Sequence, residues 1–395
     1  MTQRNALRRL VGMNSLTPST PPFRTLIAGG GVAALESALA LRELAGDRVD
    51  ITLLAPEPEF AYRPMRVREP FGYSVAKTYQ VAEIAQDIGA DFVQDAFKRL
   101  DADRSTVHTE QGAGIEYDAL LLALGARLRP AFSHGLTIDD WHIDEQLHGL
   151  IQDIEGGYVR SLAFVAPSPM SWPLPIYELA LMTAGRAYGM NVELSITIVT
   201  PEEAPLAVFG STVSETVSSL LESRGIETIL SARSEVPEPG HVAIHPGDRS
   251  LRADRIVALP QLFGPSTPGV PGGAERGFIP IDAHCAVPHV ERVWAAGDAT
   301  DFPIKHGGIA SQQADTAAAA IAALAGAAVE PKPFRPEIHA VLLGADKPLY
   351  LSAHVTGGHG SSSEISETPT WSPPSKIAAR YLAPYLESRD RAAVR

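Results

Sequence analysis

The segment Gly29-Gly30-Gly31-Val32-Ala33-Ala34 has the residue types and the spacing that bind a pyrophosphate. It satisfies the pattern G-x-G-x-x-G/A, in which Gly29 permits a tight turn, Gly31 lets the backbone approach the ligand and Ala34 allows close helix packing. The helix that begins here offers N–H donors and the positive end of its dipole to phosphate oxygens. An ordinary glycine turn before a helix has the same pattern, so further motifs must decide.

Two such motifs follow along the chain. An apolar strand from Tyr117 ends in Ala123-Leu124-Gly125, and a second apolar strand from Val293 ends in Gly297-Asp298. A carboxylate at the C-terminal edge of a parallel strand can accept a hydrogen bond from a sugar-alcohol hydroxyl. Each motif alone is also compatible with a buried strand and a turn.

The elements that must position these residues come in two similar units. Each unit reads as a strand, a helix and a second strand, the order that parallel sheets require; the residues are 24–28, 32–44 and 51–54 in the first unit and 161–166, 175–188 and 192–200 in the second. A helix is predicted over about 308–325. The tail predicts a β-excursion near 338–355, a mobile Gly/Ser-rich loop at 357–363 and a last helix around 375–387.

The three strand-end motifs, in this order, resemble the fingerprints of the two-dinucleotide-domain flavoproteins that include the pyridine nucleotide-disulfide oxidoreductases. The sequence is most similar to sulfide:quinone oxidoreductase-like flavoproteins, over roughly residues 24–328. The resemblance implies an α/β fold: two Rossmann-like doubly wound domains with three-layer β-β-α sheets, plus a small C-terminal α+β region. The expected division is a disordered leader (1–22), an FAD-binding domain in two parts (23–135 and 266–330), a second, NAD(P)-type domain (136–265) and a C-terminal region (331–395).

The resemblance also implies a bound FAD and a set of residues around it. The implied cofactor contacts are Gly29, Gly31, Ala33 and Ala34 at the pyrophosphate, Ala123 and Gly125 beside the cofactor, Gly297 and Asp298 at the ribityl chain, Lys305 near the flavin, and the N–H groups of Gly308, Ile309 and Ala310 at the pyrimidine edge. One departure is Ala55, which stands where the family usually has an acidic residue for the adenosine ribose. Glu57 is a candidate substitute, and Arg63 is either a further contact or a surface arginine.

Lys305 and Glu178 are the candidate catalytic residues. In the related group a lysine follows the Gly-Asp motif, and a glutamate on the helix of the second unit faces the flavin and can pair with such a lysine. The alternative for Lys305 and His306 is a solvated loop pair. The alternative for Glu178 is a carboxylate favoured by the helix dipole in a first turn.

The second unit departs from the family where a nicotinamide dinucleotide would bind. Instead of three glycines, its loop contains Pro167, Pro169, Trp172, Pro173 and Pro175. Proline lacks the N–H that would bind phosphate, and the indole fills space that a pyrophosphate needs. The sequence therefore disfavours ordinary NAD(P)H binding in this domain.

Cys285 is the single cysteine of the chain, which excludes a redox-active cysteine pair within it. Sulfide oxidation in the related group uses two or three cysteines beside the flavin. Cys285, in a turn before the Gly-Asp strand, is interpreted as a small buried residue rather than a nucleophile.

The formal net charge of −13 argues against a nucleic-acid partner, and no apolar run is long enough to span a bilayer. The sequence predicts a cytoplasmic homodimer with no metal site, in which the apolar residues of the last helix pack on the core or on a second copy. The favoured function is an FAD-dependent oxidoreductase that transfers electrons between an unknown donor and a quinone or protein acceptor. The alternatives are an NAD(P)H dehydrogenase or ferredoxin reductase-like enzyme, and an FAD-binding protein without turnover.

Overall fold

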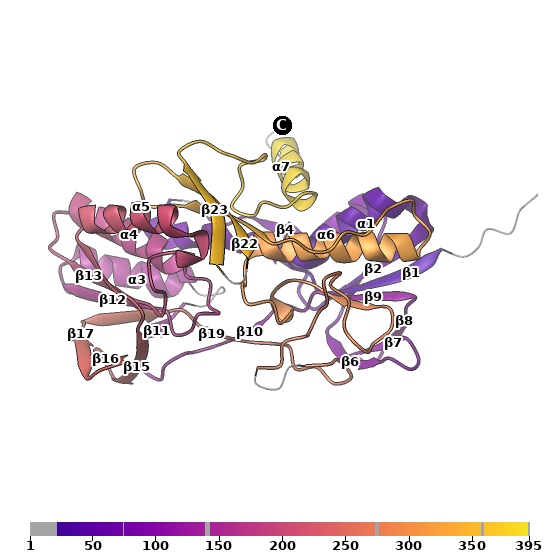
Figure 1. The fold of residues 1–395 in the computed structure, drawn as a ribbon, viewed down its shortest axis with the longest axis horizontal. Helices are drawn as coiled ribbons and strands as arrows, with labels where there is room; N and C mark the ends of the chain where they lie inside the picture. The colour runs from indigo at the N-terminus through magenta and orange to yellow at the C-terminus, as the bar shows by residue number, and fades with distance from the viewer. Residues whose placement is uncertain (1–21, 74, 139–142, 273–275, 357–358, 394–395) are drawn as a thin grey trace, which may run out of the picture.

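The computed structural model describes residues 22–393, except 74, 139–142, 273–275 and 357–358. The predicted leader therefore lies outside the described residues apart from Pro22. Figure 1 shows two lobes side by side, with the C-terminal part of the chain between and above them.

The first lobe is built on a parallel sheet of five strands. Its strands, in spatial order, are β20 (Val293–Ala295), β9 (Ala119–Leu122), β1 (Phe23–Ala28), β2 (Val49–Ala55) and β5 (Asp91–Gln94). Because β20 comes from the second half of the chain, this lobe is assembled from two separate stretches of sequence. Helices α1 (Val32–Ala45) and α6 (Gly307–Leu324) cover one face, and the antiparallel strands β6 (Phe97–Asp101), β7 (Thr106–Thr109) and β8 (Gly114–Glu116) cover the other.

The second lobe repeats this plan with residues from the middle of the chain. Its parallel sheet has the order β11 (Leu136–Thr137), β18 (Arg255–Ala258), β12 (Ser161–Val165), β13 (Ser195–Val199) and β14 (Ile226–Ile229). The helices of this lobe are α3 (Ile143–Glu155), α4 (Leu174–Gly189) and α5 (Ser211–Ser223), and its small antiparallel sheet comprises β15 (Arg233–Glu238), β16 (His241–His245) and β17 (Arg249–Arg252). The remaining short elements are β3 (Glu59–Ala61), β4 (Thr78–Gln80), α2 (Val81–Asp87), β10 (Arg127–Arg129) and β19 (Gln261–Phe263).

Alternation along the central strands explains the three layers. In β1, Ile27 faces the helices, whereas Leu26 and Ala28 face the small sheet. In β12, Phe164 and Leu162 belong to the helix side. Strands that are apolar on both sides must be covered twice, because parallel sheets bury both faces. The predicted fold class, two doubly wound domains with β-β-α layers, is confirmed.

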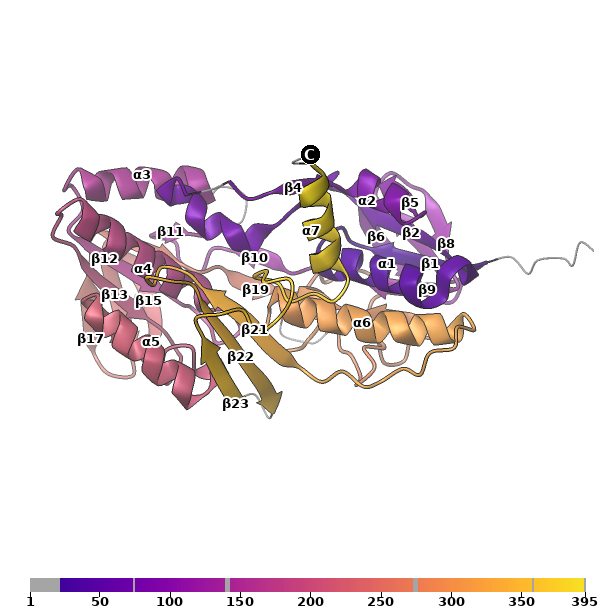
Figure 2. The same cartoon turned by 90° about the horizontal axis from the view of Figure 1, so that it is seen from above.

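The C-terminal region adds a three-stranded antiparallel sheet and one helix. The strands are β21 (Glu337–Leu342), β22 (Leu349–Thr356) and β23 (His359–Ser366), and the helix is α7 (Leu382–Ala393). Figure 2 shows this sheet reaching toward α5 and α7 standing over the junction of the lobes. The predicted Gly/Ser-rich loop at 357–363 is wrong from His359 onward, because this stretch completes a β-hairpin with β22.

The prediction of a last helix at 375–387 is wrong in its bounds. The chain remains irregular until Tyr381, and Pro384 lies in the first turn of α7. A proline is tolerated there because the first N–H groups of a helix have no intrahelical partner. Ile377, Leu382 and Leu386 are buried in the core of the first lobe, as the packing interpretation expected.

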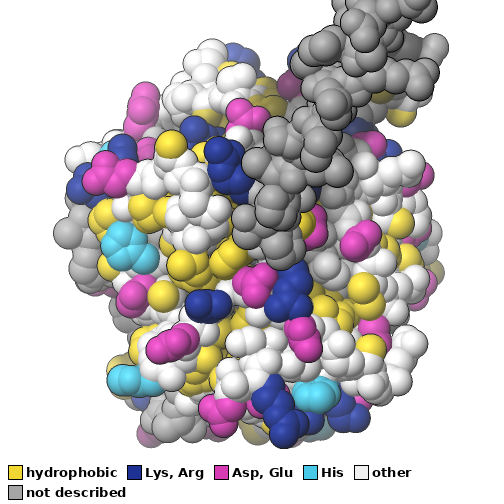
Figure 3. Space-filling model, turned by 90° about the vertical axis from the view of Figure 1, so that its right-hand side faces the viewer, with side chains coloured by type: hydrophobic (Ala, Val, Ile, Leu, Met, Phe, Trp, Pro, Cys, Tyr) yellow, Lys and Arg dark blue, Asp and Glu magenta, His cyan; other side chains and the backbone are white. Residues whose placement is uncertain are grey.

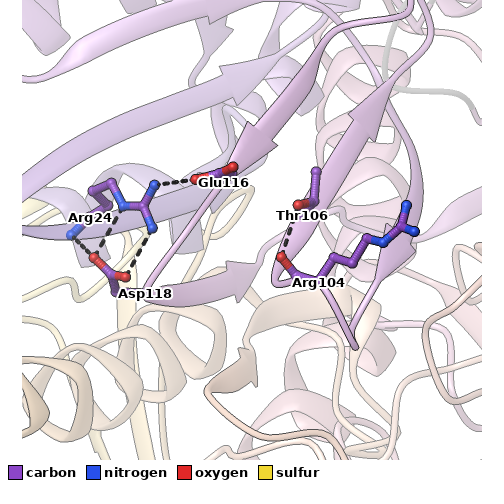
Figure 4. Close-up of polar contacts among 5 residues, drawn as sticks. All are labelled: Arg24, Arg104, Thr106, Glu116 and Asp118. Atoms are coloured by element: carbon purple, nitrogen blue, oxygen red, sulfur yellow. Dashed lines mark hydrogen bonds and ion pairs between the residues drawn. The ribbon is translucent and has the colours of Figure 1, made fainter.

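Arg24 ties the start of β1 to the neighbouring strand connection. Its guanidinium contacts Glu116 at 2.8 Å and Asp118 at 3.1 Å, and its backbone N–H donates to Asp118 at 2.9 Å (Figure 4). The Arg24 hydrogen bonds hold the pKa of the Asp118 carboxyl below its usual range.

On the face drawn in Figure 3, basic side chains lie among acidic ones rather than in one patch. Among the helices of the described ranges, none is long and apolar enough to cross a membrane.

A buried carboxyl pair fastens the C-terminal segment to the first lobe. Glu36 on α1 accepts the backbone N–H groups of Arg380, Tyr381 and Leu382. Asp315 on α6 faces Glu36, and burial followed by the charge of Glu36 raises the pKa of Asp315 to about 8. Burial also raises the pKa of Glu36, against the three N–H groups. At neutral pH the pair therefore holds a proton that the unfolded chain would release.

Asp315→Asn should weaken the pH dependence of stability. A carboxyl whose pKa is raised on folding stabilises the protein below its unfolded pKa, and this contribution is lost as pH rises from about 4 to about 8. We expect urea unfolding to show the variant gaining at least about 1 kcal/mol over wild type between pH 5 and pH 8.5. Parallel stability curves for the two proteins would show that Asp315 carries no such proton.

Candidate functional site

The loop after β1 is held tightly against two neighbouring strands. Gly29 has φ +138°, and a Cβ atom at this position would lie 2.2 Å from the carbonyl oxygen of Ala123. A Cβ at Gly30 would lie 3.0 Å from the Cβ of Ala55 at the end of β2. The loop therefore requires glycine at position 29, for space and for conformation.

Gly31 and Gly125 border open space instead. A Cβ added at either residue would meet no atom within 4 Å. Gly31 is the N-cap of α1, where no side chain accepts the free N–H groups of the first turn. Open space beside unused donors at a helix N-terminus suits the pyrophosphate of a dinucleotide. These residues thus fit the cofactor that the sequence predicts.

The other residues predicted at the nucleotide end differ in their surroundings. Ala34 is fully buried in the core and Ala55 is 1% exposed, so both act by being small. Ala33 lies beside Gly297, because a Cβ there would come within 3.2 Å of the Ala33 Cβ. Glu57 and Arg63 are exposed.

The Gly297-Asp298 turn lies between α1 and α6. Gly297 has φ +79°, and a Cβ there would be 3.2 Å from Ala33 and 3.4 Å from Ala310. The turn continues as a short 3-10 helix, η4 (Gly297–Ala299), in which Thr300 donates its hydroxyl to Gly297 O. Asp298 is partly exposed while Gly297 and Ala299 are buried, so the turn presents this one carboxylate outward.

Lys305 is buried behind the same turn, so the solvated-loop alternative is wrong. Its Nζ donates to the backbone oxygen of Thr300 and lies 4.0 Å from the ring centre of Phe278. Burial lowers the pKa of Lys305 to about 8, against the charges of Asp298 and Asp301. A lysine with this pKa can hold or release a proton near neutral pH.

The solvated-loop alternative is also wrong for His306, which caps α6. Its Nδ1 accepts the N–H of Gly308 at 3.1 Å, and its ring packs 4.6 Å from that of Trp172. Burial lowers the pKa of His306 to about 3, so the imidazole stays neutral. The N–H of Ala310 donates to His306 O. Of the three N–H groups predicted to face the flavin, those of Gly308 and Ala310 therefore have partners inside the protein.

Glu178 pairs with Lys376, and the predicted pairing with Lys305 is wrong. Lys376 Nζ lies 2.7 Å from both carboxylate oxygens, and their side chains are 7% and 1% exposed. Lys376 also donates to Pro64 O, and Glu178 accepts the N–H of Leu343. Burial raises the pKa of Glu178, against the charge of Lys376. The sequence contained one sign of this partner, a lysine inside an apolar stretch of the tail.

The proline-rich loop of the second lobe is filled by its own side chains. Trp172 packs on Phe209 as well as on His306, and Ser171 donates its hydroxyl to Pro260 O. The helix after the loop begins with Pro175 at its second position, and the N–H of Ile176 bonds back to Pro173 O. The phosphate-binding donors of a glycine-rich loop are thus replaced or already used.

Glu202, just after β13, gives a second reason why the second lobe does not suit a dinucleotide. An acidic residue at the end of a second strand is where a Rossmann domain binds a ribose. Here the carboxylate is bound by Tyr177 Oη at 2.7 Å and Thr200 Oγ1 at 3.0 Å. Burial raises the pKa of Glu202 to about 7. The sequence reasoning missed this carboxylate, although Pro201-Glu202-Glu203 follows the strand directly.

Cys285 is buried, as predicted, and lies in a turn beside β20. Its carbonyl oxygen accepts the N–H of Ala295, and burial followed by the charge of Asp282 raises the pKa of its thiol to about 12. A thiol in this environment is a poor nucleophile, because the thiolate is the reactive form.

Comparison with known proteins agrees with these features. Residues 14–155 match the family model described as pyridine nucleotide-disulphide oxidoreductase. The sulfide-quinone reductase of Aquifex aeolicus (strain VF5) is 26% identical over 257 residues, which are 62% of this chain and 58% of that protein. The ferredoxin reductase component of a chlorobenzene dioxygenase from Cupriavidus sp. (strain PS12) is 26% identical over 75% of this chain and 73% of its own. This chain thus aligns with less than two thirds of the Aquifex protein.

Solved structures agree over more of the chain. The sulfide:quinone oxidoreductase from Aquifex aeolicus superposes with a TM-score of 0.77 and 19% identity, covering 94% of this chain and 90% of that one. A ferredoxin reductase from Rhodopseudomonas palustris superposes with a TM-score of 0.65 and 20% identity, covering 85% and 83%. These likenesses confirm the fold, and with the family match they confirm the predicted resemblance.

Proposed function

We propose, for a chain related to the pyridine nucleotide-disulphide oxidoreductases, that it is an FAD-dependent oxidoreductase that passes electrons to a quinone or a redox protein. The contrast between its two lobes carries this proposal. Open space borders Gly31 and Gly125 in the first lobe, whereas Trp172 fills the corresponding loop of the second. A two-lobed fold of this kind can hold one dinucleotide without a second nucleotide site.

Each proposed site residue has a distinct task. Gly31 would admit the pyrophosphate, and Asp298 would accept a hydrogen bond from the ribityl chain. Lys305 would carry a positive charge next to Asp298 when it is protonated, and it could release this proton near neutral pH because its pKa is about 8. When bound, FAD supplies the two-electron chemistry, and the protein supplies binding, orientation and electrostatics.

Glu178 and Lys376 hold a second ionisable site where η2 (Arg63–Phe71), α4 and the C-terminal segment meet. Buried and paired, they keep their charges fixed and exclude water from this junction. We propose Lys305 and Glu178 as the catalytic residues, with Lys305 holding or releasing a proton during turnover and Glu178 contributing a negative charge that is paired with Lys376. The other residues proposed for the cofactor site are Gly29, Ala33, Glu57, Arg63, Ala123, Gly297 and Ile309 as contacts, and Ala34, Ala55, Gly308 and Ala310 as small residues that shape it.

The acceptor is proposed from the relatives. One is named a sulfide-quinone reductase, and another is named the ferredoxin reductase component of a chlorobenzene dioxygenase. Sulfide oxidation through a disulfide relay is not proposed, because Cys285 is the single cysteine and is buried. We further propose that the protein is a cytoplasmic homodimer. The proposed FAD-binding lobe comprises residues 23–135 and 266–330, and the proposed second lobe comprises residues 136–265.

The experiment that tests the function begins with the purified protein. We expect it to be yellow and to release intact FAD on heating, because the first lobe fits a dinucleotide. In stopped-flow measurements, neither NADH nor NADPH should bleach the flavin rapidly, because the second lobe lacks free phosphate donors. Once reduced chemically, the flavin should be reoxidised faster by a soluble quinone or a ferredoxin than by oxygen alone.

Three results would count against the proposal. If the protein binds no FAD when FAD is supplied in excess, the proposed cofactor is wrong. Rapid bleaching by micromolar NADH would support the NAD(P)H dehydrogenase alternative instead. Reoxidation by oxygen alone, with no acceleration by any acceptor, would support a flavin-binding protein without turnover.

A further inference from the structure

Gln313 is a fully buried polar side chain that the proposed function has not used. It lies on α6, directly behind the turn that carries Asp298. Its Oε1 accepts the backbone N–H of Gly297 at 2.8 Å and lies 3.4 Å from Thr300 Oγ1. Both contacts join the side chain to the turn, one at each end of it.

The turn needs this support because its conformation is demanding. Gly297 adopts φ +79° between Ala33 and Ala310, and its buried N–H requires an acceptor. Lys305 holds the other end through Thr300 O. Gln313 and Lys305 together hold the backbone on both sides of Asp298, so they hold the position from which its side chain extends.

The other end of the Gln313 side chain does not contribute to this support. Its Nε2 is buried and has no hydrogen-bond partner among the described residues. The buried atom is shielded from solvent, so it cannot contact a ligand directly. A buried donor without a partner is unfavourable. A glutamine at this position therefore costs stability at Nε2 while it serves Gly297 through Oε1.

We propose that Gln313 is a positioning residue for FAD, acting through the Gly297–Thr300 turn on Asp298. This inference rests on the proposed FAD site. It assigns to Gln313 a contribution to cofactor affinity that is separate from its contribution to folding.

The neighbouring Gln312 provides a matched control. It is also on α6, and its amide makes two hydrogen bonds to Glu337, at 2.7 Å to the carbonyl oxygen and 3.0 Å from the N–H. Gln312 thus ties α6 to the C-terminal sheet, and among the described residues its side chain makes no hydrogen bond to the turn. Comparing the two glutamines separates the effect of losing a contact between α6 and the C-terminal sheet from the effect of losing the hydrogen bond to Gly297.

The test measures FAD dissociation constants and apoprotein melting temperatures for wild type, Gln313→Leu, Gln313→Glu and Gln312→Leu. Gln313→Leu should weaken FAD binding about tenfold, the loss expected for one hydrogen bond in the site, and should also lower the apoprotein melting temperature, because the buried N–H of Gly297 loses its acceptor. Gln313→Glu keeps an acceptor for Gly297 and should restore most of the affinity. Gln312→Leu should lower the melting temperature and leave the FAD affinity unchanged.

Visible circular dichroism of the bound flavin gives a second readout, since a shifted Asp298 should change the spectrum in Gln313→Leu alone. Wild-type affinity in Gln313→Leu, or equal weakening in Gln312→Leu, would overturn the inference. If Gln313→Leu does not fold, the affinity and spectrum of Gln313→Glu decide: wild-type values support the acceptor role and weak binding opposes it. Failure of wild type itself to bind FAD would instead refute the proposed function and this inference with it.

Discussion

Gly31→Ala should leave the apoprotein as stable as wild type and lower its affinity for FAD at least about tenfold. The new methyl group meets no protein atom within 4 Å, and the residue has an ordinary extended conformation with φ −91°. Only a ligand would collide with it. The expected loss reflects a phosphate pushed away from the N–H groups at the start of α1.

Gly29→Ala is the matched variant, two residues earlier in the same loop. Its methyl group would lie 2.2 Å from Ala123 O at a φ of +138°. We expect this variant to lose several kcal/mol of stability, since it combines a backbone clash with a strained conformation. Chemical denaturation of the apoproteins and fluorescence titration with FAD measure both effects. Unchanged FAD affinity in Gly31→Ala would place the pyrophosphate elsewhere.

Lys376→Met should have the second large effect, on folding rather than on the cofactor. The substitution leaves Glu178 buried with the N–H of Leu343 as its remaining partner. Breaking a buried ion pair from one side typically costs about 3–5 kcal/mol. Part of this loss should be recovered in the double variant with Glu178→Gln, because the second change removes the uncompensated charge.

Two control variants separate this effect from general loss of charge. Lys347 forms an ion pair of similar length, 2.8 Å, with Glu367, but both side chains are largely exposed. Lys347→Met should leave the unfolding midpoint unchanged, because solvent screens such pairs. Lys305→Met should leave the Glu178–Lys376 pair intact. Equal destabilisation by Lys376→Met and Lys347→Met would show that the buried pair does not stabilise this junction.

The sequence was sufficient for the parts of the fold that local pattern controls. The apolar strands around Ile27, Leu121 and Phe164 and the glycine loop after β1 predicted the two parallel sheets and their helices. The same pattern gave the position of Asp298 at a strand end. These features are predictable because the end of a strand and the turn after it are determined by residues that are adjacent in the sequence.

Contacts between distant segments were not predictable in the same way. Glu178 and Lys376 are 198 residues apart, and no periodicity indicates which lysine meets which glutamate. The sequence predicts the last helix from residue 375, several residues before α7 begins at Leu382, because the packing of the preceding segment on the first lobe is not visible in local pattern. The capping of α6 by His306 was missed because a histidine before two glycines also suits an exposed loop. In each case long-range packing decided between local alternatives.

The position of the Glu178–Lys376 pair has a consequence for motion. Lys376 lies next to Ile377 in the core of the first lobe, so the pair joins this lobe to the C-terminal sheet through Leu343 and to the second lobe through α4. The contact between Trp172 and His306 joins the lobes a second time. Hinge closure of one lobe over the other would have to break both contacts and expose an ion pair to water. The buried ion pair and the Trp172–His306 contact therefore both oppose hinge movement between the lobes.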